Sequence, residues 1–176
     1  MYGTDDPTIN LYVDAAFAVH PQDSTCHGGI YITLGDHSGP IYVRSSKIKL
    51  VCTSICEAEL YKMVDGVKQT YPLAKLLNEI GAIPSLQFIV HEDNEASIII
   101  SYAGEGRTTK AKSFRVRYDF LKQLLEDGTI IIKHCKTSDM IADYLTKGMV
   151  GETFTRLTTI AMGRQRKGSV KARTTA

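Results

Sequence analysis

The order of strand-like and helix-like segments constrains this chain more than any other feature of its sequence. Residues 10–20 (NLYVDAAFAVH) place Leu11 and Val13 on one face and Asp14 on the other, as period-2 alternation requires. Two more strand-like segments follow at 26–35 and 39–47, and the turn between them reads GDHSG. Short connections of this kind favour an antiparallel meander of three strands.

The rest of the chain alternates helix-like and strand-like segments. Helical spacing begins at residue 54, and we expect Pro72 to perturb it, so that a second helix continues to Gly81. Strands joined through helices run parallel. The sequence therefore predicts an α/β fold with a five-stranded mixed sheet, three antiparallel strands and then two parallel ones, flanked by helices. The later predicted strands are 85–92 and 129–135, and the later predicted helices are 93–103, 113–127, 138–148 and 151–163.

Composition and charge favour one globular domain followed by a short basic extension. A hydrophobic content of 43% in 176 residues is sufficient for a core, and we predict the domain at residues 1–163. Residues 164–176 (RQRKGSVKARTTA) hold five basic residues and no acid, and are predicted to be a disordered tail. Without these five, the chain has 16 basic against 19 acidic residues. The tail could bind nucleic acid or could be a solubilising end.

Cysteine usage and hydropathy predict where the chain resides. The four cysteines, at positions 26, 52, 56 and 135, have no metal-type spacing, which favours free thiols in a reducing compartment. No signal peptide and no long apolar run is present. We therefore expect an intracellular protein, in the cytoplasm or nucleus, without membrane association.

Three aspartates occupy positions where this residue needs an explanation. Asp14 lies within a strand, where Asp is disfavoured unless the strand is an exposed edge. Asp93 falls between a strand and a helix, so it could be an N-cap or part of a site at the end of a strand. Asp143 lies in a short helix, where a solvated helix face would also account for it.

Two glutamates, Glu57 and Glu59, differ by the local structure around them. Ser54 and Glu57 form the pattern S-x-x-E, a capping box in which Ser54 caps the third amide and Glu57 returns to the Ser54 amide. This gives Glu57 a structural role. Glu59 has no such explanation, so it is the better candidate for chemistry.

These carboxylates together predict a site for a hard cation. Asp14, Glu59, Asp93 and Asp143 come without paired bases, and Mg²⁺ prefers oxygen ligands. Two such ions can activate a water molecule and stabilise the leaving oxygen of a phosphodiester.

Four segments, in this order, make the chain resemble the ribonuclease H domain of copia-type LTR retrotransposon polyproteins. The resemblance covers nearly all of residues 10–163. The segments are YVDAAFAVHP followed by HGG, then RSSKIKLVCTSICEAELY, VHEDNEASI and KTSDMIADYLTKGM. One such fragment would be weak, whereas four in order are specific.

The resemblance implies an activity and a set of residues. The family's catalytic carboxylates match Asp14, Glu59, Asp93 and Asp143, and their implied role is to bind two Mg²⁺ ions, with Mn²⁺ as a substitute. The implied reaction is hydrolysis of the RNA strand of an RNA/DNA hybrid during reverse transcription. The implied partners are that hybrid and a reverse transcriptase domain in the same polyprotein.

The chain also departs from the family pattern. Ser113 stands where the family often has His, Gly148 where Pro is common, and Lys62 where a small residue is frequent. None of these changes removes a carboxylate. They leave open a catalytically inactive hybrid-binding or assembly domain as the alternative function, with a DNA-cutting relative such as an integrase as a third.

Substrate contacts are predicted from a basic segment. Five basic residues and no acid lie within positions 107–117, which suits either a solvated surface or a phosphate-binding patch. The substrate-binding candidates are Lys110, Lys112 and Arg115. His134 lies near the place of a mobile histidine in cellular ribonucleases H, but a structural role within a strand explains it better.

Overall fold

The sheet has the predicted five strands in the order β3-β2-β1-β4-β5. The computed structural model describes residues 7–36, 39–103 and 112–162. Strand β2 pairs antiparallel with both β1 and β3, while β4 pairs parallel with both β1 and β5. The predicted mixed sheet is therefore confirmed, and β1, which carries Asp14, is its central strand. The strands are β1 (Ile9–Ala16), β2 (Cys26–Leu34), β3 (Pro40–Ile48), β4 (Phe88–Glu92) and β5 (Ile130–His134).

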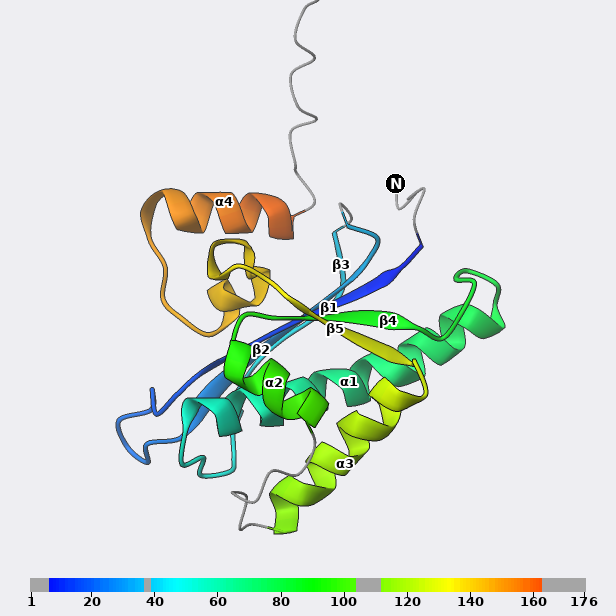
Figure 1. The fold of residues 1–176 in the computed structure, drawn as a ribbon. Coiled ribbons are helices and arrows are strands. Elements are labelled where there is room, and N and C mark those ends of the chain that lie inside the picture. The colour runs from blue at the N-terminus through cyan, green and yellow to red at the C-terminus, as the bar shows by residue number, and fades with distance from the viewer. Residues whose placement is uncertain (1–6, 37–38, 104–111, 163–176) are drawn as a thin grey trace, which may run out of the picture.

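Helices cover both faces of this sheet. On one face lie α1 (Ile55–Glu79), α2 (Glu95–Ala103) and α3 (Lys112–Glu126), and the main core forms between them and the sheet (Figure 1). On the other face lie two short 3₁₀ helices, η1 (Thr137–Asp139) and η2 (Ile141–Leu145), and then α4 (Gly151–Ala161). A smaller core of Tyr31, Ile141 and Ala161 joins this second layer to β2.

The prediction of two helices separated near Pro72 is wrong, because α1 runs unbroken for 25 residues with Pro72 inside it. The ring of Pro72 is exposed, so the backbone bond that proline cannot make is lost on the solvent side. Val67 and Ala74, on either side of the proline, are both fully buried in the main core. Burial of one continuous apolar face therefore keeps the helix intact.

The predicted short helix at 138–148 is also different in detail. It consists of η1 and η2, with the extended residue Met140 (φ −68°, ψ 95°) between them. Met140 is fully buried, so the break is held by packing. The result is a compact turn that places Asp143 and the residues after it over the sheet.

Two glycines of β2 allow close packing on opposite faces of the sheet. A Cβ atom added to Gly29 would lie 2.7 Å from the carbonyl oxygen of Ala142 and 2.8 Å from Cβ of Leu145. On the other face, a Cβ at Gly28 would lie 2.5 Å from Cδ of Lys62. Lys62 is buried and donates to Ser46 Oγ at 3.2 Å and to Asp65 Oδ2 at 3.0 Å. The HGG segment therefore makes room for η2 and for a buried lysine stem.

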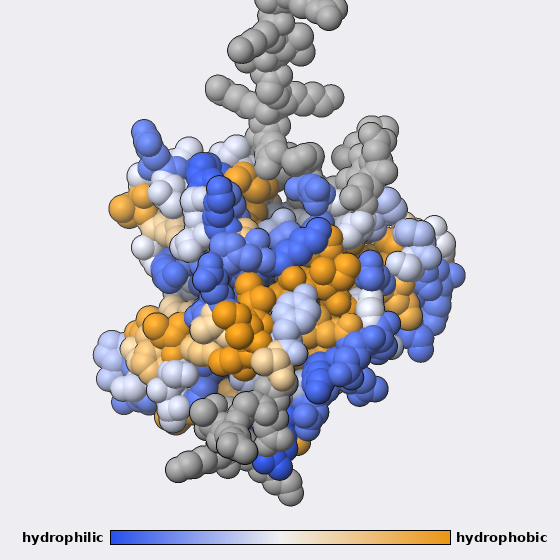
Figure 2. All heavy atoms as spheres, viewed as in Figure 1, coloured by the Kyte–Doolittle hydropathy of each residue, from blue (hydrophilic) through white to orange (hydrophobic). Residues whose placement is uncertain are grey.

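The outer surface shows which helix faces remain in contact with solvent. In Figure 2, apolar side chains gather over α2, where Ile99 is 65% exposed. Helix α3 is amphipathic, since its own Tyr118 and Leu121 are buried against the core while Arg115 and Val116 on its outer side are exposed. No helix among the described residues is both long and apolar enough to cross a membrane.

Candidate active site

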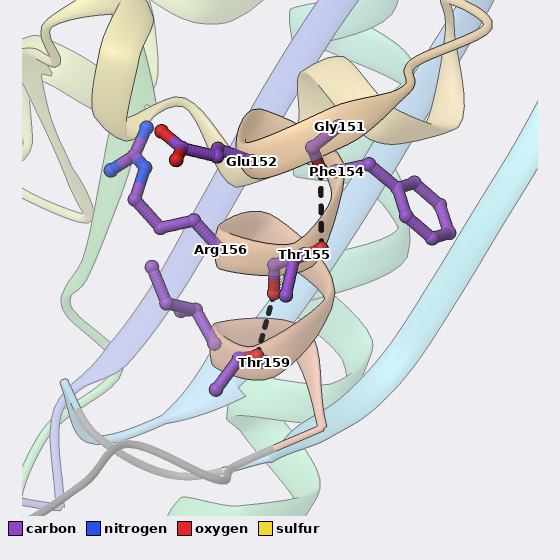
Figure 3. Close-up of a pocket in the computed structure, with 7 residues that line it drawn as sticks. Gly151, Glu152, Phe154, Thr155, Arg156 and Thr159 are labelled. Carbon is purple, nitrogen blue, oxygen red and sulfur yellow. Dashed lines mark hydrogen bonds between the residues drawn. The ribbon is translucent and has the colours of Figure 1, made fainter.

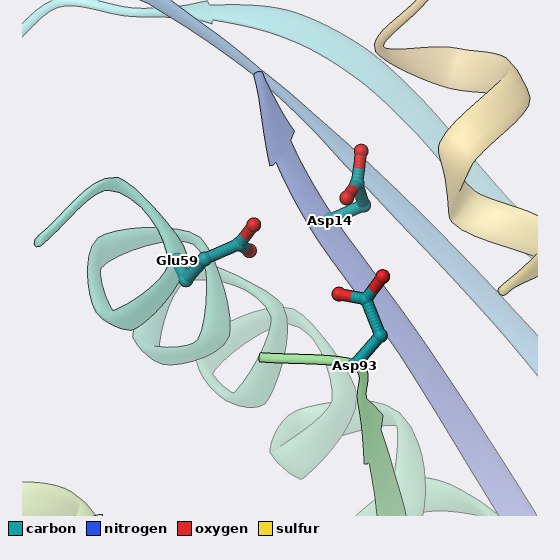
Figure 4. Close-up of side chains that lie close together, drawn as sticks. All are labelled: Asp14, Glu59 and Asp93. Atoms are coloured by element: carbon teal, nitrogen blue, oxygen red, sulfur yellow. The ribbon is translucent and has the colours of Figure 1, made fainter. Parts of the chain in front are cut away.

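Three of the predicted carboxylates meet at one end of the central strands. One carboxylate oxygen from each of Asp14, Glu59 and Asp93 lies within 4.8 Å of the others. Figure 4 shows their side chains converging from β1, from the first turns of α1 and from the end of β4. Asp14 and Glu59 are buried, whereas Asp93 is partly exposed. The cluster is therefore set into the protein and open at one side.

The parallel pairing of β1 with β4 brings the two aspartates together. Tyr12 and His91 are partners in that register. Asp14 lies two residues after Tyr12 within β1, and Asp93 lies two residues after His91, directly beyond the end of β4. Because alternate residues of a strand share a face, Asp14 and Asp93 project to the same side of the sheet. Asp14 is thus a residue of a central strand, and the exposed-edge alternative does not apply to it.

The start of α1 separates the two glutamates. Ser54 is the N-cap, and its Oγ accepts from the Glu57 amide at 3.1 Å. Glu57 Oε2 accepts from the amide of Thr53 at 2.5 Å, one residue earlier than the capping box predicts. Glu57 therefore ties down the helix start, although at a different amide, and Glu59 on the next part of the turn is buried towards Asp14.

Capping of α2 frees Asp93 from a structural role. Asn94, not Asp93, supplies the capping side chain, because its Oδ1 accepts from the Ser97 amide at 3.1 Å. The N-cap alternative for Asp93 is therefore wrong. Its carboxylate is left to face Asp14 and Glu59.

Asp143 approaches the cluster from the opposite layer, on η2, and does not belong to the group of three. Its carboxylate forms an ion pair with Lys147, whose ammonium also lies 4.0 Å from Asp14 Oδ1. The Thr146 hydroxyl donates to Asp14 Oδ2. Asp143 is buried, so a solvated helix face does not describe it. Thr146 and Lys147 therefore link the fourth predicted carboxylate to the other three.

Burial and mutual repulsion dominate the electrostatics of the cluster. Burial, together with the negative charges of the neighbouring Glu92 and Asp14, raises the pKa of Glu59 to about 11. Burial also raises the pKa of Asp14 to about 6, although the Thr146 hydrogen bond and the charge of Lys147 oppose this shift. Keeping these carboxyl groups ionised, buried and close together is unfavourable in free energy, and a proton or a cation between them would offset this.

The cluster forms the floor of a solvent-accessible hollow of about 520 Å³. Its walls combine the acidic residues with the apolar side chains of Phe17, Val19 and Ile55, which are 38%, 45% and 53% exposed. A larger hollow lies along α4 (Figure 3), but its threonines bond to carbonyls of their own helix and Arg156 pairs with Asp139. Of these two hollows, the one at the sheet end contains the convergent carboxylates.

Comparison with solved structures identifies the fold. A ribonuclease H1 isolated from compost by a metagenomic approach superposes with a TM-score of 0.56 at 15% identity, covering 79% of this chain and 92% of that one. The same enzyme in complex with an RNA/DNA hybrid gives 0.54 at 16% identity, covering 78% and 93%. The protease-reverse transcriptase of prototype foamy virus gives 0.55 at 16% identity, covering 82% of this chain and 21% of that one.

This chain has a ribonuclease H-like fold. Its sequence relatives are retrotransposon polyproteins, as the copia-type resemblance predicts. The Pol polyprotein of transposon RE1 from Arabidopsis thaliana is 26% identical over 147 residues, which is 84% of this chain and 10% of the relative. That of transposon RE2 is 28% identical over 140 residues, 80% of this chain and 9% of the relative. The domain thus spans about a tenth of these relatives, and no protein-family model matches it.

A buried acid of the ribonuclease H-like domain, Glu92, was missed by sequence reasoning. Glu92 is fully buried beside Glu59, and burial raises its pKa to about 8. Its Oε1 accepts from the Asn94 amide at 3.0 Å, but its Oε2 and the Oε2 of Glu59 have no hydrogen-bond partner among the described residues. The signal in the sequence was an acid at the end of a strand that begins with three apolar residues, directly before Asp93.

The predicted substrate contacts are only partly visible. Lys110 lies outside the described residues, as does the basic tail at 164–176, and Lys112 opens α3 without a described side chain. Arg115 is exposed on the first turn of α3. Two positions further, the Arg117 guanidinium lies 5.0 Å from the ring centroid of Tyr61, a contact that stabilises α3 against α1. His134 lies at the end of β5, within a strand as expected.

Proposed function

We propose that this domain is a metal-dependent endoribonuclease that hydrolyses the RNA strand of RNA/DNA hybrids during retrotransposon reverse transcription. The observation that carries the proposal is the convergence of Asp14, Glu59 and Asp93 within 4.8 Å, at the strand ends of a ribonuclease H-like sheet. Ionised carboxylates this close together repel one another unless protons or cations lie between them.

The donor set fits Mg²⁺. All the converging atoms are carboxylate oxygens, and one oxygen of the buried Glu59 has no hydrogen-bond partner within the described part of the chain. We assign Asp14, Glu59, Asp93 and Asp143 as the residues that would hold two Mg²⁺ ions, with Mn²⁺ as a substitute. When bound, such ions supply an activated water and stabilise the leaving oxygen of a phosphodiester.

The residues of the chain would prepare the site for this chemistry. Asp14, on the central strand, faces both Asp93 and the η2 layer, so its carboxylate would help to hold the cations. The Thr146 hydroxyl fixes one of its oxygens. The open side of the hollow gives a backbone phosphate access to the carboxylates, while Phe17, Val19 and Ile55 offer apolar surface to a sugar face.

The proposed partners follow from the same comparisons. The compost ribonuclease H1 was solved with an RNA/DNA hybrid, and the foamy virus chain is a protease-reverse transcriptase. By analogy, we propose that this domain acts on a hybrid produced by a reverse transcriptase domain of the same polyprotein, in the cytoplasm or nucleus. Lys110, Lys112 and Arg115 remain the predicted phosphate contacts.

Cleavage of a labelled hybrid tests the proposal directly. The purified chain should cut the RNA strand in the presence of Mg²⁺ or Mn²⁺, leaving 3′-hydroxyl and 5′-phosphate ends, and EDTA should abolish cutting. A DNA duplex of the same sequence is the control and should stay intact. Binding of the hybrid without cleavage in either metal would instead support a catalytically inactive hybrid-binding domain.

A crossed pair of variants separates the two glutamates. Glu57→Gln is expected to lower the free energy of unfolding by about 1 kcal/mol, because it weakens the helix start, and to retain cleavage. Glu59→Gln is expected to abolish cleavage without lowering the melting temperature.

The reason lies in the protonation of Glu59. Its pKa rises from 4.5 in the unfolded chain to about 11 in the folded one. The free energy of unfolding therefore falls as pH rises between these two values, because the unfolded chain releases the proton more readily. A glutamine removes this loss near neutral pH. Thermal unfolding in EDTA and hybrid cleavage, measured on both variants, check the pair. Loss of cleavage in Glu57→Gln alone would contradict the assignment.

A further inference from the structure

The ammonium of Lys147 lies where a cation serving Asp14 and Asp143 would lie. It forms an ion pair with Asp143 Oδ1 and lies 4.0 Å from Asp14 Oδ1. The lysine also lines the hollow above the cluster, and it is the one cationic side chain among the described lining residues. Lys147 therefore already neutralises part of the acidic charge.

The two ends of the carboxylate cluster are not equivalent. At the end formed by Asp14, Glu59 and Asp93, an oxygen of Glu59 is buried and accepts no hydrogen bond from the residues that the structure describes. At the end formed by Asp14 and Asp143, the oxygens are engaged by Lys147 and by the Thr146 hydroxyl. An ammonium group that donates a hydrogen bond to a carboxylate oxygen competes with a metal ion for the lone pairs of that oxygen.

Lys147 is also placed so that it can withdraw. Its side chain is 48% exposed, so the ammonium can move into water without unpacking the core. The next residue, Gly148, has nothing within 4 Å of an added Cβ, so the backbone there is not confined by packing. Electrostatic attraction therefore holds Lys147 at the cluster, and packing contributes little.

We propose that Lys147 is a built-in counter-ion that a divalent cation must displace from Asp14 and Asp143. This inference rests on the proposed function, because it concerns the same carboxylates. Lys147 holds η2 towards β1 while the cation is absent, and its withdrawal opens the Asp143 end of the cluster. Lys147 is thus a positioning residue, and it sets the Mg²⁺ concentration at which the site is completed.

Calorimetric titration of the whole chain with MgCl₂, without nucleic acid, tests this role. Lys147→Met keeps most of the length of the unbranched side chain and removes its charge. This variant is expected to bind Mg²⁺ about tenfold more tightly at the end of the cluster formed by Asp14 and Asp143, because a competing positive charge a few ångströms away is gone. In EDTA the same variant should melt at a lower temperature than the wild type, since Asp14 and Asp143 then repel each other unopposed.

A matched variant removes an equal charge elsewhere. Lys136→Met alters an exposed lysine that does not line the hollow, and it should change Mg²⁺ affinity by less than about twofold. Acetylation of the wild-type chain, read by mass spectrometry, gives a second readout. Mg²⁺ should increase the modification of Lys147 and leave that of Lys136 unchanged.

Equal Mg²⁺ affinity in the wild type and Lys147→Met, together with Lys147 acetylation that does not respond to Mg²⁺, would overturn the inference. Failure of the proposed function would look different. The wild-type chain would then cleave no hybrid, while the differences in affinity and acetylation at Lys147 persisted. The two ideas can therefore fail separately.

Discussion

Asp14→Asn is expected to reduce cleavage of the RNA strand by about a thousandfold or more while leaving the domain folded. Asp14 connects two parts of the site. It lies in the cluster with Glu59 and Asp93, and it also contacts Thr146 and Lys147 near Asp143. Asparagine keeps the shape and one acceptor oxygen but removes the charge. A loss of about 4 kcal/mol of transition-state stabilisation corresponds to a thousandfold in rate.

Asp14→Asn should raise the free energy of unfolding although it reduces cleavage. Because burial raises the pKa of Asp14 to about 6, its charged form is costly near neutral pH, and a neutral amide removes that cost. Single-turnover cleavage and thermal unfolding in EDTA measure the two effects. Asp127→Asn is the control, since Asp127 lies before β5, at the other end of the parallel strands, and caps the Thr129 amide at 2.9 Å. Full cleavage by Asp14→Asn would contradict the site.

Gly29→Ala is expected to reduce cleavage by about a hundredfold although every carboxylate remains. The added methyl group would meet the Ala142 carbonyl oxygen at 2.7 Å, so η2 must move away from the sheet. Gly29 is the register partner of Asp14, and η2 carries Asp143. A displacement of about 1 Å of a group in a reacting site can cost this much in rate.

The same substitution should lower the free energy of unfolding by about 1–3 kcal/mol, the usual range for overpacking. Gly148→Ala is a matched control. It adds the same methyl group beside the same segment, but in open space and without a positive φ. Chemical denaturation and cleavage rates of both variants, with Mg²⁺ raised tenfold to rule out weaker metal binding, decide the outcome. Equal activity of the two variants would show that η2 need not lie against β2.

Local patterns predicted most of the fold because each strand carries its own signal. Alternation in residues 10–20 gave the two faces of β1, and short turns gave the antiparallel pairs. The continuation of α1 through Pro72 could not be predicted locally, since burial of Val67 and Ala74 by the rest of the chain overrides the proline.

A site residue could be predicted from the sequence where neighbouring residues already accounted for the local structure. Glu59 stood out because Ser54 and Glu57 explain the start of the helix. The environment of Asp143 was not predictable, because Thr146 and Lys147 meet Asp14 only through tertiary structure. Glu92 was missed for the same reason, since alternation along a strand does not show that the first turns of α1 lie above it.

The hydrogen bond between Thr146 and Asp14 joins residues 132 positions apart. Contacts of such long sequence separation form late in folding, after local structure and neighbouring strand pairs. Asp14, Glu59 and Asp93 can meet once the first strands, α1 and β4 have been made, but η2 arrives only when the chain has been synthesised beyond residue 147. The candidate site therefore acquires its last acidic residue only after the sheet and α1 have been synthesised, so a growing chain would hold the group of three carboxylates before it held all four.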